Sequence, residues 1–316
     1  MKRLLVIRCS SLGDVVLTTG VIRIFKRLHS DVIIDMLTYK EYKDIFANFP
    51  YIDKLLLIDR NLSYFAFLKR LKKATEHYNY IVDLQKNLKT IPLMLLRYSK
   101  YYTFNKLSIR RRIFVHLKKG GKYLNTHITE RYLQAFNKIR PVHADNLEEL
   151  RPQISAENCQ CVEKRIVIHP FASKKTKEWV HFDELIYKLK EIGYNIAIVG
   201  RGECNILNGV KNFTNKTDLG ELINEINKAS IVISTDSGPM HLAIALNKKV
   251  IVIFGSTTKE LGFYPYFKKC YVLENNKLRC RPCHVHGRKK CPLNHFQCMQ
   301  DIKIDMVINL LSTVIH

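Results

Sequence analysis

Residues Ser230–Leu246 of this 316-residue chain read SIVISTDSGPMHLAIAL and predict a strand, a turn and a helix in immediate succession. The apolar run Ile231–Ile233 is typical of a buried strand. Ser237 suits the N-cap of the following helix, and Pro239 suits its first turn, where a missing N–H costs nothing. Such a helix start offers N–H groups and a partial positive charge, which together favour phosphate. An ordinary strand-to-helix turn has the same pattern, so this stretch alone leaves both interpretations open.

Three further residues of the same stretch favour a ligand at the helix start. Gly238 has no side chain and lets another group approach the backbone closely. Asp236 and His241 flank the turn with groups that can bond sugar hydroxyls. These residues suit a phosphate that carries a sugar, while an ordinary strand-to-helix turn stays possible from the local pattern alone.

Length and composition indicate a globular chain of about two domains, with 316 residues and a hydrophobic content of 47%. The longest apolar runs, such as Val250–Phe254, have the length of a strand and fall far short of the ~20 residues that span a bilayer. The start of the chain superficially resembles a signal peptide, but Arg8 ends its apolar run too early, so it predicts a first strand. We expect a cytoplasmic protein.

Strand-like and helix-like segments alternate along both halves, which predicts an α/β fold with two parallel sheets, each covered by helices. The polar segment Pro141–Pro152 separates the halves, so we expect domains at residues 1–152 and 153–316. Two doubly wound, Rossmann-like domains of this kind bind ligands at the carboxyl ends of their strands, in a central cleft that they face. Expected strands of the first half are 4–7, 32–37, 55–58, 80–84 and 101–104, with helices at 15–28, 41–49, 64–77 and 129–138.

The formal charge of +24 is unevenly placed, because no acidic residue lies between Asp83 and Glu130. Apolar side chains are interleaved with the Lys and Arg residues of this stretch. A basic surface of that kind suits anionic lipid or a phosphorylated glycolipid, and it would also suit nucleic acid. A solvated basic face without a partner is the third interpretation.

Three more blocks of sequence accompany the opening stretch in a fixed order. They are Arg8–Thr19, His169–Ser173 with Lys177-Glu178-Trp179, and Cys280–Cys283 with Cys291–Met299. With the D-[ST]-G-P-x-H-L-A-x-A-L pattern of the opening stretch, the chain resembles glycosyltransferase family 9, the ADP-heptose:lipopolysaccharide heptosyltransferases, nearly end to end.

The resemblance implies a GT-B-like fold and the transfer of heptose from ADP-heptose to a lipopolysaccharide inner-core acceptor, with inversion. The N-terminal domain would bind the acceptor, a phosphorylated lipid A/Kdo-type glycolipid. The C-terminal domain would bind the nucleotide sugar, and the C-terminal helix would pack back on the first domain. The enzyme would work at the cytoplasmic face of the inner membrane as a peripheral protein, and no cofactor is required.

The general base is placed by this resemblance at Asp14, in the turn after the first strand. A carboxylate there could take the acceptor proton at hydrogen-bond distance. Asp14 could also cap a helix that begins at Val15, and both roles are compatible. On the acceptor side, we expect Ser10, Ser11 and Gly13 to shape the turn and Thr18 to line the site.

Lys177 is expected to neutralise the charge of the leaving diphosphate. We expect this residue in the loop after strand 165–169. By resemblance, Ala172 and Ser173 contact phosphate. An exposed basic loop is the alternative interpretation. Trp179, the single tryptophan, is interpreted as a packing residue.

The remaining donor contacts are also carried over by resemblance. Glu203 follows a predicted strand and a Gly-x-Gly turn and would bond the ribose hydroxyls. Ser237 and Gly238 would hold the diphosphate, while Asp236 and His241 would reach the heptose. Asp236 is not expected to touch phosphate directly, because like charges repel.

The cysteines Cys280, Cys283, Cys291 and Cys298 form the pattern C-x₂-C-x₇-C-x₆-C. The C-x₂-C start could supply half of a structural zinc or iron site without a catalytic role. Buried small hydrophobic residues and redox-sensitive thiols are the alternatives.

Two other functions stay open at the level of sequence. The same family could use another nucleotide sugar or another surface-polysaccharide acceptor. A non-enzymatic nucleic-acid-binding protein would fit the basic charge, but the acids Asp14, Glu203 and Asp236 at strand ends would repel a phosphate backbone. We therefore expect no nucleic acid partner.

Overall fold

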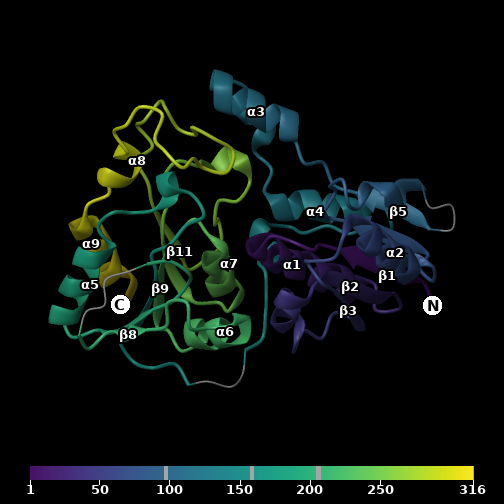
Figure 1. Cartoon of the computed structure of the whole chain (residues 1–316), viewed down its shortest axis with the longest axis horizontal. Helices are drawn as coiled ribbons and strands as arrows, with labels where there is room; N and C mark the ends of the chain where they lie inside the picture. The colour runs from purple at the N-terminus through teal and green to yellow at the C-terminus, as the bar shows by residue number, and fades with distance from the viewer. Residues whose placement is uncertain (96–98, 157–159, 204–207, 316) are drawn as a thin grey trace. The chain divides into compact units, whose positions relative to one another are not determined.

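The computed structural model describes residues 1–95, 99–156, 160–203 and 208–315 (Figure 1). The chain divides into two compact units. Unit 1 comprises residues 1–106 and 127–155, and unit 2 comprises residues 107–126 and 156–316. The sequence predicts a single boundary at 152/153, whereas in the structure residues 107–126 group with the second unit.

Unit 1 is built on a five-stranded sheet in which every neighbouring pair of strands is parallel. In spatial order its strands are β3 (Lys54–Ile58), β2 (Ile33–Tyr39), β1 (Arg3–Ile7), β4 (Tyr80–Asp83) and β5 (Lys100–Thr103). Its helices are α1 (Leu12–Leu28), α2 (Tyr64–Thr75) and α4 (Ile128–Asn137), with short 3₁₀ helices η1 (Lys40–Phe46), η2 (Ile91–Leu95) and η4 (Leu147–Leu150).

The core of unit 1 follows from the alternation of side chains along β1. Leu5 and Ile7 point to the face that α2 covers with Phe67 and Leu71, and all four belong to one buried cluster. Leu4 and Val6 point to the opposite face and are also fully buried. Both faces of the sheet are therefore covered, as the apolar strands of a parallel sheet require.

Unit 2 contains a six-stranded sheet that is also parallel throughout. In spatial order its strands are β11 (Cys270–Leu273), β10 (Lys249–Ile253), β9 (Ile231–Thr235), β6 (Arg165–His169), β7 (Asn195–Ile198) and β8 (Lys211–Asn212). Its helices are α3 (Ser108–Leu117), η3 (Gly121–Leu124), η5 (Lys175–Lys177), α5 (Phe182–Glu191), α6 (Leu219–Asn227), α7 (Gly238–Ala245), η6 (Lys259–Leu261), α8 (Gln297–Gln300) and α9 (Ile304–Ile315).

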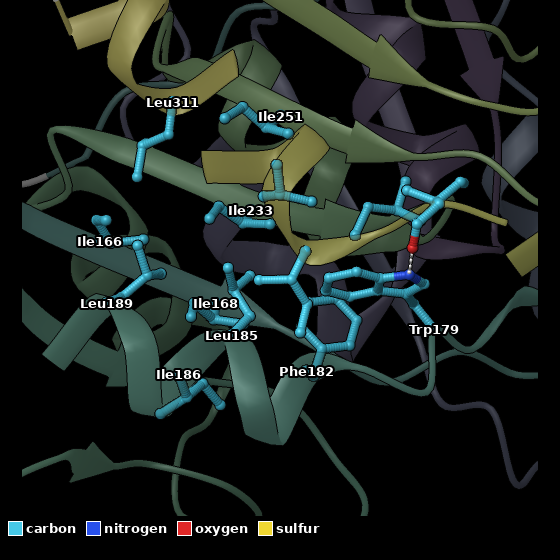
Figure 2. Packing of buried hydrophobic residues seen from close by; sticks show 14 of the residues in the cluster. Ile166, Ile168, Trp179, Phe182, Leu185, Ile186, Leu189, Ile233, Ile251 and Leu311 are labelled. Carbon is cyan, nitrogen blue, oxygen red and sulfur yellow. Dashed lines mark hydrogen bonds between the residues drawn. The ribbon is translucent and has the colours of Figure 1, made fainter. Parts of the chain in front are cut away.

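One face of this second sheet packs against α5 and α9, as Figure 2 shows for Leu185 and Leu311. Trp179 lies in the same cluster, and its Nε1 donates a hydrogen bond to the carbonyl oxygen of Ile302 at 2.8 Å (Figure 2). The predicted packing role of Trp179 is confirmed.

The C-terminal helix α9 belongs to the core of unit 2. The apolar side of α9 is formed by Val307, Leu311 and Val314, which are buried in the core of unit 2. The helix contacts β10 and β11. The apolar face of α9 is therefore occupied within unit 2, and the expected packing of this helix on the first domain stays a prediction.

Each sheet has one position where the chain changes direction. In unit 1 it lies between β1 and β4, and in unit 2 between β6 and β9. At such a switch point the loops after the two strands run to opposite sides and leave a crevice at the carboxyl ends. Asp14 follows β1, and Lys177 and Asp236 follow β6 and β9, so these three candidate residues lie at the two switch points. Within the described part of the chain, we find no helix whose length and apolar character would let it span a bilayer.

Candidate active site

Asp14 lies in the first turn of α1, at the carboxyl end of β1. The helix begins at Leu12, so Asp14 does not cap a helix that starts at Val15, as one interpretation of the sequence proposed. Ser11 occupies the N-cap position instead, and its Oγ donates to Asp14 Oδ2 at 2.8 Å. The helix start thus fixes the direction of the carboxylate.

Two residues from other parts of unit 1 complete the surroundings of this carboxylate. Arg8 Nη2 forms an ion pair with Asp14 Oδ2 at 2.7 Å. The hydroxyl of Tyr132, on α4, donates to Asp14 Oδ1 at 3.2 Å. Arg8 is itself held, because its Nη1 donates to the carbonyl oxygen of Leu84, just after β4. The group that we name the Arg8–Asp14 cluster comprises Arg8, Ser11, Asp14 and Tyr132.

Burial and the neighbouring polar groups have opposite effects on the charge state of Asp14. Burial by itself raises the pKa of the carboxyl. The positive charge of Arg8 and the hydrogen bonds from Ser11 and Tyr132 outweigh burial, and the net pKa lies below its usual value. Asp14 is therefore ionised at neutral pH and can accept a proton.

The neighbouring residues that the sequence singled out have different surroundings. Ser10 N donates to Gln85 Oε1 at 3.0 Å, so Gln85, which follows β4, holds the turn. Ser11 is exposed and Gly13 is buried within the helix start. Thr18 corrects an expectation: it is fully buried, and its Oγ1 donates to the carbonyl oxygen of Val15, so it does not line the acceptor side.

In unit 2 the helix predicted from Ser230–Leu246 is α7, which begins at Gly238 with Pro239 in its first turn. Ser237 is the N-cap residue by position, but its side chain makes no capping hydrogen bond. Its Oγ lies 3.1 Å from His169 Nδ1 and donates to the carbonyl oxygen of Thr235 at 3.1 Å. The first-turn N–H groups of a helix have no partner within the helix, so this end of α7 is suited to an anion.

Lys177 and Asp236 form an ion pair beside this helix start. Lys177 Nζ lies 2.8 Å from Asp236 Oδ2, and both side chains are nearly nine-tenths buried, with exposed fractions of 12% and 10%. Thr257 Oγ1, after β10, donates to the same Asp236 oxygen at 2.6 Å. Lys177, Asp236 and Thr257 are named the Lys177–Asp236 cluster.

Asp236 has the same electrostatic competition as Asp14. Burial raises the pKa of its carboxyl, while the charge and hydrogen bond of Lys177, the Thr257 hydroxyl and His241 lower it, and the net pKa is below the usual value. His241 is buried on α7. The alternative interpretation of Lys177 as part of an exposed basic loop does not hold for this residue.

His169 ends β6 and is missing from the sequence-based assignments. Burial lowers the pKa of its imidazole to about 4, so the ring is neutral at pH 7. Gly200, with φ of +118°, lies against this ring, and a Cβ at Gly200 would come within 2.6 Å of the ring carbon Cδ2. The glycine after β7 therefore makes room for His169, which in turn contacts Ser237.

The other predicted donor residues lie on loops at the same edge of the sheet. Ala172 is half-buried and Ser173 is exposed in the loop after β6. Glu203 is exposed in the loop after β7, where Gly202 N donates to Asn215 Oδ1 at 3.1 Å. The roles of these three residues toward phosphate and ribose stay predictions.

The cysteine-rich segment supports the loop that carries Lys177. Thr176 N donates to the carbonyl oxygen of Arg288 at 3.1 Å, and Arg288 N donates to Thr176 Oγ1 at 2.8 Å. A Cβ at Gly287 would lie 3.0 Å from the Lys177 side chain. The segment between Cys283 and Cys291 therefore holds Lys177 in its buried position.

Cys280, Cys283, Cys291 and Cys298 line one cavity of about 260 Å³ in unit 2. They are free thiols, and among the described residues no three His, Cys, Asp or Glu side chains are placed to hold a metal ion. The structural zinc or iron centre considered from the spacing is thus not formed as a ligand set here. Cys298 is instead a core residue, and burial raises the pKa of its thiol to about 11.

Solved structures share the fold of this chain. A glycosyltransferase family 9 protein from Veillonella parvula superposes with a TM-score of 0.76 at 17% identity, covering 99% of this chain and 97% of that chain. An Escherichia coli heptosyltransferase with ADP-2-deoxy-2-fluoro heptose gives a TM-score of 0.69 at 17% identity, covering 98% and 99%. The two parallel-sheet units have the GT-B fold of these glycosyltransferases.

Sequence comparison is more specific. The chain is 24% identical to lipopolysaccharide heptosyltransferase 1 of Campylobacter coli, over 98% of each protein. The profile of glycosyltransferase family 9 (heptosyltransferase) matches residues 64–294. The chain belongs to glycosyltransferase family 9 and is a transferase enzyme.

Proposed function

We propose that this enzyme transfers heptose from ADP-heptose to a lipopolysaccharide inner-core acceptor, with inversion at the transferred carbon and Asp14 as general base. The observation that carries the proposal is the buried ion pair of Lys177 and Asp236 beside the start of α7. It places a cation and an anion-receptive helix end at the switch point of one sheet. The similar proteins named above, which include a heptosyltransferase solved with an ADP-heptose analogue, support the choice of donor.

On the donor side, Lys177 has three N–H donors and uses one of them on Asp236. The others can reach a phosphate oxygen while Asp236 keeps the side chain in place. The start of α7 adds backbone N–H groups. Together they stabilise the negative charge that grows on ADP as the glycosidic carbon–oxygen bond breaks.

Asp236 can at the same time bond a heptose hydroxyl through the carboxylate oxygen that Lys177 does not hold. His241 and the Ser237 hydroxyl lie on the same helix start. Glu203 would bond the ribose, and Ala172 and Ser173 the phosphates. These assignments rest on the resemblance and on the position of the residues at the carboxyl ends of β6, β7 and β9.

On the acceptor side, the acceptor oxygen attacks the anomeric carbon of heptose, and ADP leaves from the opposite face. The hydroxyl proton passes to a carboxylate oxygen of Asp14 as the new bond forms. Arg8 and Tyr132 keep this carboxylate ionised and fixed before the reaction. Because its pKa is low, Asp14 takes the proton only as the attacking oxygen becomes acidic in the transition state.

We further propose that the acceptor is a phosphorylated lipid A/Kdo-type glycolipid and that the enzyme works as a peripheral protein at the cytoplasmic face of the inner membrane. The support is the charge of +24, with an acid-free stretch between Asp83 and Glu130. A phosphorylated glycolipid meets such a surface with complementary charge.

A panel of nucleotide sugars tests the donor. Thermal unfolding is followed with ADP-heptose, ADP-glucose, UDP-glucose and GDP-mannose at equal concentrations, and product formation is then measured with the inner-core acceptor. We expect ADP-heptose to give the largest rise in unfolding temperature, since a ligand stabilises the state that binds it. Stabilisation and turnover with another nucleotide sugar alone would replace the proposed donor.

A further inference from the structure

An apolar stripe on α3 faces solvent in a strongly basic segment of unit 2. Ile109, Ile113 and Leu117 recur every four residues, which places them on one side of the helix. Their exposed fractions are 73%, 48% and 63%. The opposite side is buried through Arg111 and Val115. The helix therefore presents these three apolar side chains outward, the reverse of what a surface helix needs for folding.

Positively charged side chains surround this stripe. Residues 107–126 contain six Lys or Arg residues and no Asp or Glu. At 100° per residue, Arg110 and Arg112 lie on the two flanks of the stripe. Just beyond the helix, Tyr123 is 60% exposed, and Lys122 Nζ lies 5.1 Å from its ring centroid. An apolar stripe with Arg on both flanks is the pattern of a helix that lies in a membrane interface.

The inner side of α3 holds the helix in a fixed orientation. Lys118, the C-cap residue, donates from Nζ to the carbonyl oxygens of Cys280 and Pro282. Val115 and His116 line the same cavity as the four cysteines of the C-x₂-C-x₇-C-x₆-C pattern. The helix is therefore attached to unit 2 through one side and leaves the stripe free.

We propose that the outer face of α3, formed by Ile109, Ile113 and Leu117 with Arg110 and Arg112, is a docking surface for an anionic phospholipid bilayer. Charge complementarity selects this occupant. A second copy of the chain would bring the same basic segment against itself, and like charges oppose a symmetric contact. Nucleic acid would satisfy the Arg residues but would leave the apolar stripe without a partner. The inference rests on the proposed function in one respect, namely that the acceptor is a membrane lipid.

Vesicle binding tests the surface directly. The full chain is sedimented with vesicles of phosphatidylethanolamine and phosphatidylglycerol (3:1) and with vesicles of phosphatidylcholine, at 50 and 500 mM salt. We expect binding to the anionic vesicles only, weaker at high salt because the charge attraction is screened. The variant Ile109→Glu/Ile113→Glu should bind at least tenfold more weakly. Ile192→Glu, an exposed isoleucine at the end of α5, is the matched control and should bind like the unmodified protein.

The inference would be overturned if the double variant bound vesicles as well as the unmodified protein does, or if the unmodified protein bound phosphatidylcholine as well as the anionic vesicles. A dimer in size-exclusion chromatography that the double variant abolishes would also overturn it.

Turnover separates this inference from the proposed function. The double variant should keep full turnover on a water-soluble, delipidated acceptor and lose turnover on the same acceptor in vesicles. If the unmodified protein transferred heptose to neither acceptor while the double variant still lost vesicle binding, the docking surface would be supported and the proposed function would be overturned.

Discussion

The Arg8–Asp14 cluster and the Lys177–Asp236 cluster both contain an ion pair between a carboxylate and a cation, but the two pairs differ in function. Each consists of a largely buried carboxylate paired with a cation at the switch point of a parallel sheet, with ion-pair distances of 2.7 and 2.8 Å. In both, burial raises the pKa of the carboxyl, and the cation together with the hydrogen bonds more than compensates. The difference lies in which member of the pair is free to act.

In unit 1 the cation is an arginine, and both of its terminal nitrogens have partners. Arg8 bonds Asp14 with one nitrogen and the Leu84 carbonyl with another, so it orients the carboxylate and leaves Asp14 as the group that can react. In unit 2 the cation is a lysine on a loop, while Thr257 and Lys177 both bond the same oxygen of Asp236. There the Asp236 carboxylate holds the lysine side chain in place, and the Lys177 ammonium is the group that can bind a phosphate. One pair is arranged to present a base and the other to present a cation.

Removal of the base should have the largest effect. Asp14→Asn keeps the size of the side chain and removes its capacity to accept a proton, so we expect turnover to fall by ~10³-fold. The rate of ADP release in the presence of acceptor measures it. Asp59→Asn, at a half-exposed aspartate of the same unit, is the control and should retain full turnover. Turnover within tenfold of the unmodified enzyme would exclude Asp14 as the base.

Removal of the cation should come next. Lys177→Met keeps the length of the stem and removes the charge, so kcat/KM for the donor should fall by ~10²-fold. The matched control is Lys175→Met in the same loop, where the side chain is exposed and paired with Glu178. If both variants lost activity equally, the loop would act through its general charge, and the specific role of Lys177 would be wrong.

Replacement of Arg8 should sharpen the comparison through pH. Asp14 is ionised above a pKa that is lower than usual, so the intact enzyme should show no loss of activity from this group as pH falls from 8 to 6. In Arg8→Gln, burial is no longer offset by a charge, and the pKa of Asp14 rises. Activity at pH 6 relative to pH 8 should then fall by about threefold to tenfold. Parallel pH profiles for the two proteins would show that Arg8 does not set this pKa.

The smallest effect is expected at Thr18. Thr18→Val removes a hydroxyl that bonds only a carbonyl of its own helix, so KM for the acceptor should change by less than about twofold. A steady-state titration with acceptor checks this. A larger rise in KM would restore the discarded interpretation that Thr18 lines the acceptor site.

The donor side could be predicted from sequence because its residues are close together along the chain. The strand β9, the turn and the helix α7 all lie within Ser230–Leu246, and Pro239 with Gly238 marks the helix start. The position of Lys177 after β6 also follows, since consecutive parallel strands end at one edge of a sheet. The ion pair with Asp236 did not follow, because it joins loops after two different strands.

The acceptor side was predicted less completely. Tyr132 on α4 contacts Asp14 although it lies 118 positions further along the chain. The periodicity of a sequence predicts helices and strands but not a contact between such distant residues. Thr18 shares a helix side with Asp14, but it lies one turn further from the helix start and is covered there. The sequence predicted a basic stretch with interleaved apolar side chains that suits anionic lipid, but it did not predict that part of this stretch forms the helix α3.

Calorimetric titration of ADP-heptose into the two variants tests the separation of roles most directly. We predict that Asp14→Asn binds the donor with the affinity of the unmodified enzyme and that Lys177→Met binds it at least tenfold more weakly. Weakened donor binding in Asp14→Asn together with unchanged binding in Lys177→Met would contradict the account.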